Sequence, residues 1–201
     1  MCVTCYLSTD KKLTPISWQE SNPGFNLELE DKIRPTGMTG KYVYYCGSWQ
    51  GCGCGFREIG RITEQLLKQT RKELEEMDIH LRRYSELTSR QWWNNLTPPP
   101  KTLEELNDME LSLRRGWQDT AALNALVEDI CADGYSCQVF ICWAEDEEKT
   151  VDYQYYVNLD TDPLCFNFRT SDAQGQEQEE KLDYTRLYHI SRPSRNFYKH
   201  C

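Results

Sequence analysis

The stretch Ser136-Cys-Gln-Val-Phe-Ile-Cys-Trp-Ala-Glu145 decides the fold class. Its apolar side chains fall on both faces of an extended chain, which is typical of a strand in the middle of a sheet. Segments rich in β-favouring residues follow it at 150–160, 164–169 and 183–190. We therefore expect a meander of about four strands in the C-terminal part of the chain.

A long helix is predicted upstream, from about 58 to 93. Within it Leu67, Leu74 and Leu81 recur every seven residues, which is the spacing of an apolar stripe on a helix. The run Pro98-Pro99-Pro100 ends this pattern, because proline cannot continue a helix. Such a stripe would also suit a second copy of the chain or another protein, so one hypothesis is an interaction or self-association module built on this helix.

Two further helices are expected between the prolines and the central strand. Thr102-Leu-Glu-Glu105 has the pattern of a capping box, in which the Thr102 side chain accepts from the amide of Glu105. An apolar face predicts another helix over 120–132, and Gly134 supplies its stop.

The N-terminal part adds two strands. Residues 2–9 alternate in polarity, and Lys41-Tyr-Val-Tyr-Tyr-Cys46 is rich in β-favouring aromatic residues. The segment between them carries Pro and Gly and is interpreted as a loop. The expected fold is α+β, a mixed or antiparallel sheet of about six strands with a helical middle section packed on one face.

The organisation predicted from these patterns is one domain over 1–201. A helical insertion occupies about 57–117, and the polar, acidic segment at about 171–182 is expected to be a mobile loop because it has nothing apolar to bury.

The overall charge limits the classes of partner. A formal net charge of −9 argues against nucleic acid and against an anionic membrane surface, both of which need a basic face. The sequence holds no apolar run long enough for a membrane helix and begins without the layout of a secretory signal. We therefore expect a cytoplasmic protein, in which structural disulfides are rare. The ten cysteines are then metal ligands, reactive thiols or small buried side chains, and not all ten need have the same role.

The segment Cys46-Gly-Ser-Trp-Gln-Gly-Cys-Gly-Cys-Gly-Phe56 is the main candidate site. Glycine permits a close approach of the backbone to a ligand, and cysteine supplies a soft ligand or a nucleophile. The leading hypothesis is a metal site, with zinc favoured, since four thiolates at about 2.3 Å form an ordinary structural zinc site. Its candidate ligands are Cys2, Cys5, Cys46, Cys52 and Cys54.

The alternation of side chains along a strand argues against all five cysteines binding one metal ion. If residues 2–9 form a regular strand, Cys2 and Cys5 point to opposite faces. Cys5 then shares a face with Val3 and Leu7, which suits a small buried side chain.

Other interpretations of the same loop stay open. A helix starting just beyond Phe56 would lower the pKa of Cys52 and Cys54 through its dipole, as in a thiol oxidoreductase or a Cys-nucleophile enzyme. The backbone amides of the loop could instead hold a phosphate, or the loop could be only a tight turn. If Met1 is removed, the Cys2 amine could serve as the base for its own thiol.

Three segments resemble a small group of uncharacterised bacterial cytosolic proteins that share a Gly-Cys-Gly-Cys-Gly-Phe loop. They are the N-terminal Met-Cys…Tyr-Leu-Ser-Thr-Asp, the stretch Tyr42–Phe56 and the strand Val139–Asp146. The resemblance implies a bacterial cytoplasmic setting and no particular activity.

Overall fold

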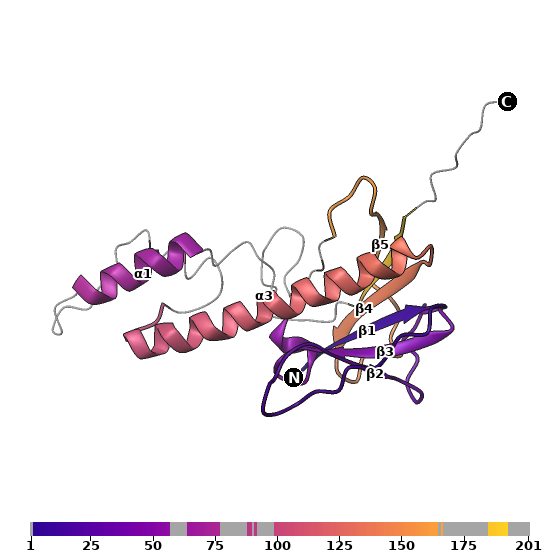
Figure 1. Cartoon of the computed structure of the whole chain (residues 1–201), viewed down its shortest axis with the longest axis horizontal. Helices are drawn as coiled ribbons and strands as arrows, with labels where there is room; N and C mark the ends of the chain where they lie inside the picture. The colour runs from indigo at the N-terminus through magenta and orange to yellow at the C-terminus, as the bar shows by residue number, and fades with distance from the viewer. Residues whose placement is uncertain are drawn as a thin grey trace.

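The computed structural model describes residues 2–56, 64–76, 88–89, 91, 99–164, 166 and 185–192. Within these residues six strands form one sheet in the order β2-β3-β1-β4-β6-β5 (Figure 1). All neighbours are antiparallel except β5 and β6. The strands are β1 (Val3–Thr9), β2 (Asn26–Leu29), β3 (Tyr42–Gly47), β4 (Cys137–Trp143), β5 (Tyr153–Asn158) and β6 (Arg186–Ser191). The predicted α+β fold with a mixed sheet is confirmed.

Strand β4 lies in the interior of the sheet, as its apolar sequence predicts. It pairs with β1 on one side and with β6 on the other, and six of its seven residues are buried. Val139 and Ile141 belong to the large core, whereas Phe140 belongs to a smaller core on the other face. Apolar residues are therefore needed on both faces of this strand, and Gln138 near its start is a buried polar exception.

Two sequence-based expectations about strands were wrong. Strand β2 lies in the segment interpreted as loop, because only four residues pair with β3 and two of them are exposed, so no alternation is readable. The segment 164–169 was predicted as a strand, but Leu164 and Phe166 lie outside the strands of the described residues. The rest of that segment lies outside the described residues.

Helix α3 (Leu103–Ala132) is one continuous helix of 30 residues, in place of the two helices predicted. Gly116 is buried inside it, and Thr120 Oγ1 donates to the Gly116 carbonyl over 2.8 Å, so neither residue breaks the helix. The predicted cap is confirmed, since the Thr102 side chain accepts from Glu105 N over 3.1 Å. Gly134, with a φ of 85°, follows the C-terminus as predicted.

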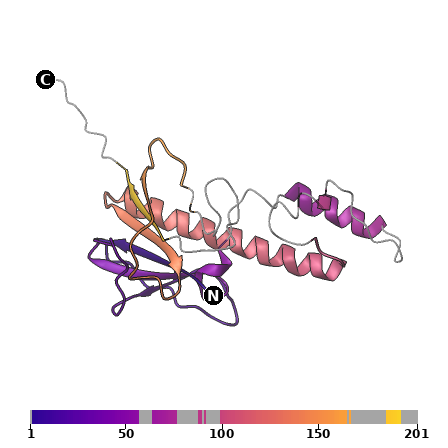
Figure 2. The same cartoon turned by 180° about the vertical axis from the view of Figure 1, so that it is seen from behind.

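The two halves of α3 have different partners. Its C-terminal half lies across one face of the sheet, where Leu123, Val127 and Ile130 are fully buried in the large core. Its N-terminal half projects beyond the sheet and packs against α1 (Glu64–Glu76), as both views show (Figures 1 and 2). No described helix is both long and apolar enough to cross a membrane.

Helix α1 confirms part of the predicted 58–93 helix. Leu66 and Leu67 are buried against Leu106 of α3, and Leu74 packs against the same cluster. The apolar stripe of α1 is therefore used within the chain. The stripe residue Leu81 lies outside the described residues, as do 57–63 and the acidic segment 171–182.

Candidate metal centre

The sheet topology brings two distant thiol-bearing segments together. Strands β1 and β3 are antiparallel neighbours with Tyr6 opposite Tyr45, so the start of β1 lies beside the end of β3. Cys2 immediately precedes β1, and the short 3-10 helix η1 (Gly53–Gly55) follows β3. As a result the Sγ atoms of Cys2, Cys52 and Cys54 all lie within 4.8 Å of one another.

The loop after β3 closes on itself through hydrogen bonds. Ser48 N and Ser48 Oγ both donate to the Cys52 carbonyl, over 3.0 and 2.6 Å, and Gly51 N donates to the Ser48 carbonyl over 2.7 Å. Gly51 has a φ of 74°, which favours glycine. A Cβ at Gly53 would lie 2.8 Å from the Val3 carbonyl oxygen. Glycine at 53 therefore permits the loop to press against β1.

Backbone amides donate to two of the three sulfurs. Val3 N donates to Cys54 Sγ over 3.0 Å. The Cys54 amide donates to Cys52 Sγ. Such N–H···S bonds stabilise negative charge on sulfur, as the groups surrounding metal-bound thiolates do.

The protonation of Cys52 depends on whether a cation is present. Burial raises the pKa of Cys52 to about 11, and the neighbouring Cys54 and Cys2 thiols act in the same direction, against the hydrogen bond from the Cys54 amide. Cys52 is thus a thiol at neutral pH when no cation is bound. A metal ion would take the place of that proton, because binding requires thiolate ligands.

The N-terminal side of the group is partly open to solvent. Cys2 is exposed, whereas Cys52 and Cys54 are half-buried. The Ala144 amide donates to the Cys2 carbonyl over 2.8 Å and so fixes the Cys2 backbone to the chain just beyond β4. The group is therefore accessible to an incoming ion while its backbone is held by the sheet.

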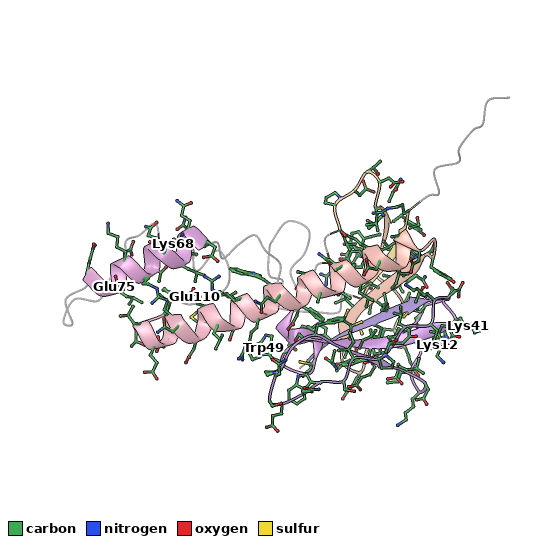
Figure 3. All side chains as sticks on the ribbon, in the orientation of Figure 1. Lys12, Lys41, Trp49, Lys68, Glu75 and Glu110 are labelled. Atoms are coloured by element: carbon green, nitrogen blue, oxygen red, sulfur yellow. The ribbon has the colours of Figure 1, made fainter. Side chains whose placement is uncertain are left out.

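Helix α3 anchors the loop from the other side through Asp119. Asp119 Oδ2 accepts from Trp49 N over 2.7 Å, and the same carboxylate accepts from the Phe25 amide. The Arg115 guanidinium lies over the Trp49 ring, 5.5 Å from its centroid. Figure 3 shows Trp49 beside α3 at the point where the helix leaves the sheet.

Sequence reasoning missed Asp119. It lies four residues before Leu123 on the buried face of α3, and it is 5% exposed. A carboxylate on an apolar helix face is the signal that could have found it, because such a group needs donors in the interior.

Two of the five predicted ligands lie elsewhere. Cys5 and Cys46 are fully buried in the large core, and their side chains hydrogen-bond to each other between β1 and β3. Cys5 shares the core with Leu7, as strand parity predicts. Burial raises the pKa of the Cys5 thiol, so it suits packing better than metal ligation. The structure does not bring these two thiols to the group formed by Cys2, Cys52 and Cys54.

The other described cysteines and His189 are also outside the group. Cys131, Cys137 and Cys142 are buried core residues, and none of the eight cysteines in the described part of the chain forms a disulfide. His189 lies on β6, and two strands, β1 and β4, stand between β6 and β3 in the sheet. Its side chain hydrogen-bonds to Gln138. Residues 165, 200 and 201 lie outside the described residues.

No family model, no curated protein and no solved structure matches this chain.

Proposed function

We propose that this protein binds a thiophilic metal ion, zinc first, through Cys2, Cys52 and Cys54. The observation that carries the proposal is the convergence of three Sγ atoms within 4.8 Å of one another. Around a tetrahedral zinc with bonds of about 2.3 Å the sulfurs stand about 3.8 Å apart. A small inward movement of the side chains therefore suffices to enclose an ion.

The donor set favours a soft or borderline ion. Thiolates select zinc, monovalent copper and iron in preference to magnesium or calcium, which take oxygen ligands. The amide donors at Cys52 and Cys54 offset part of the negative charge that three thiolates bring together. Three thiolates fill three of the four positions of a tetrahedral zinc, and the fourth is left to water or to another ligand.

The two alternatives have less support. A thiol oxidoreductase or Cys-nucleophile enzyme needs a thiol with a lowered pKa, whereas burial raises the pKa of Cys52 to about 11. An interaction module on the 58–93 helix needs an available apolar stripe, whereas Leu67 is buried against α3. Metal binding remains the function that the geometry supports best.

Metal analysis of the protein purified without an affinity tag, after equilibration with zinc and removal of the excess, tests the proposal. We expect about one zinc per chain, lost in C52S and in C54S. C142S is the matched control: Cys142 Sγ lies 3.0 Å from Thr4 Oγ1, serine can keep that hydrogen bond, and Cys142 is outside the group. Wild-type protein without metal, or C52S and C54S that retain it, would overturn the proposal.

A further inference from the structure

A hollow of about 400 Å³ lies at one end of the sheet, and more than half of its lining residues alternate along the chain with those that pack under α3. The strand register aligns one row of its floor across β1, β4, β6 and β5. That row is Ser8, Gln138, His189 and Tyr156. The lining continues with Ser191 and Asn158, two residues further along β6 and β5 on the same face, and with Asp10 and Ser136, which lie just outside the ends of β1 and β4. The floor therefore consists of hydrogen-bonding side chains from four neighbouring strands and the residues next to them.

Hydrogen bonds fix the orientation of this floor. Thr39 N donates to Gln138 Oε1 over 2.7 Å and Ser8 Oγ donates to the same atom over 3.0 Å, which sets the orientation of the amide. Gln138 Nε2 then donates to His189 Nδ1 over 3.2 Å. The His189 proton consequently lies on Nε2, which faces Gln154 Oε1 at 3.3 Å. Gln138 is 8% exposed, so the row is built into the fold before any ligand arrives.

The outer end of the floor row is an exposed aromatic ring. The Tyr156 ring stacks on His189 with centroids 4.7 Å apart and planes at 8°. Tyr156 is nevertheless 75% exposed, so most of its ring surface is open to a ligand. A rigid aromatic ring beside polar groups offers apolar contact at low cost in side-chain entropy.

The charge of the hollow selects against anions. Among its described lining residues Asp10 is the one acidic side chain, and none is lysine or arginine. The chain also carries a formal net charge of −9. A phosphate or carboxylate group would therefore meet no opposite charge there. Hydroxyls and side-chain amides both donate and accept, which matches a ligand rich in hydroxyl groups.

We propose that this hollow is a binding site for a neutral polyhydroxylated ring compound, a mono- or disaccharide, with its ring carbons on Tyr156 and its hydroxyls on the polar rows. The volume falls in the range of small-molecule sites. None of Cys2, Cys52 and Cys54 lines the hollow, so the proposal is independent of the metal site.

The test is an amide-resolved NMR titration of the full chain with a panel of neutral mono- and disaccharides at millimolar concentration. We expect at least one to shift the amide resonances of Gln138, Tyr156 and His189. Its phosphorylated counterpart, for example glucose 6-phosphate compared with glucose, should bind at least about tenfold more weakly, because the hollow has no positive side chain to pair with the phosphate. Nucleosides serve as a second neutral panel.

Paired tyrosine variants locate the contact. Y156A should weaken binding about tenfold by removing the exposed aromatic ring. Y155A should leave affinity within about twofold, since Tyr155 is on the opposite face of β5 and stacks on Tyr188. The proposal is overturned if no saccharide shifts these resonances, if the phosphorylated compound binds equally well, if nucleosides bind in preference, or if both variants bind like the wild type.

Discussion

Val3 and Cys54 are 51 residues apart in the chain, and Val3 N donates a hydrogen bond to Cys54 Sγ over 3.0 Å. The bond joins the first residue of β1 to the loop after β3, so it exists only when those strands pair. The same pairing brings Cys2 to Cys52 and Cys54. Formation of the cluster of Cys2, Cys52 and Cys54 and formation of the sheet are therefore coupled.

This coupling predicts that zinc stabilises the fold. A ligand that binds only the folded chain raises the free energy of unfolding by about 2.7 kcal/mol when its free concentration is 100 times Kd. Urea titrations with and without zinc should show that increase in the wild type and none in C54S. An equal increase in C54S would place the stabilising ion somewhere else.

Gly53 should not tolerate a side chain. In G53A the new Cβ would lie 2.8 Å from the Val3 carbonyl oxygen, a backbone atom that the sheet holds in place. We expect a loss of about 1–3 kcal/mol in the free energy of unfolding, together with weaker zinc binding. G24A is the control, because its Cβ would make an ordinary contact at 3.7 Å with Asp119 Oδ1. Equal stability of G53A and G24A would contradict this account of the loop.

Asp119 should position the loop without touching the metal. D119A leaves the Trp49 and Phe25 amides without their shared acceptor, which we expect to cost about 1–3 kcal/mol of stability. Zinc affinity should fall while the stoichiometry stays at about one per chain, unlike in C52S. D119N keeps one carbonyl oxygen and should recover part of both properties. Unchanged zinc affinity in D119A would show that the loop does not depend on this anchor.

The pH dependence of His189 follows from its surroundings. Burial lowers the pKa of His189 below its ordinary value. Protonation at Nδ1 would also place an N–H donor opposite the N–H donor of the Gln138 amide. The unfolded chain therefore takes up this proton first, so stability falls as the pH drops from the ordinary histidine pKa toward the folded value. An NMR titration of the His189 ring should give a pKa below about 6.5. A value at or above that would be inconsistent with the hydrogen-bond arrangement.

The packing of α1 on α3 can be tested with two leucines. Leu67 is 2% exposed in the interface, so L67A should lower the free energy of unfolding by about 2–5 kcal/mol. Leu111 lies on α3 but is 50% exposed, so L111A should change it by no more than about 0.5 kcal/mol. Similar values for the two variants would show that the α1 stripe is not a buried interface.

Local patterns predicted much of the fold. The doubly apolar stretch 136–145 identified the interior strand, the Thr102 pattern identified the start of α3, and strand parity placed Cys5 in the core. These features depend on residues close together in sequence, and each has a period or a cap that can be read directly.

Features that depend on distant partners could not be predicted in the same way. The register of β1 against β3 selects Cys2, and not Cys5 or Cys46, as the companion of Cys52 and Cys54. Helix α3 continues through Gly116, which is buried although glycine has a low helix propensity, and that burial is set by residues distant in sequence. Strand β2 is too short for any periodicity.

X-ray absorption spectroscopy at the zinc edge of the zinc-loaded protein, compared with its C2S variant, shows directly which thiols hold the ion. We expect sulfur neighbours at about 2.3 Å in the wild type. We expect one fewer sulfur in C2S, because Cys2 is one of the three converging thiols. A shell of nitrogen and oxygen alone, or an unchanged number of sulfurs in C2S, would contradict the proposed metal site.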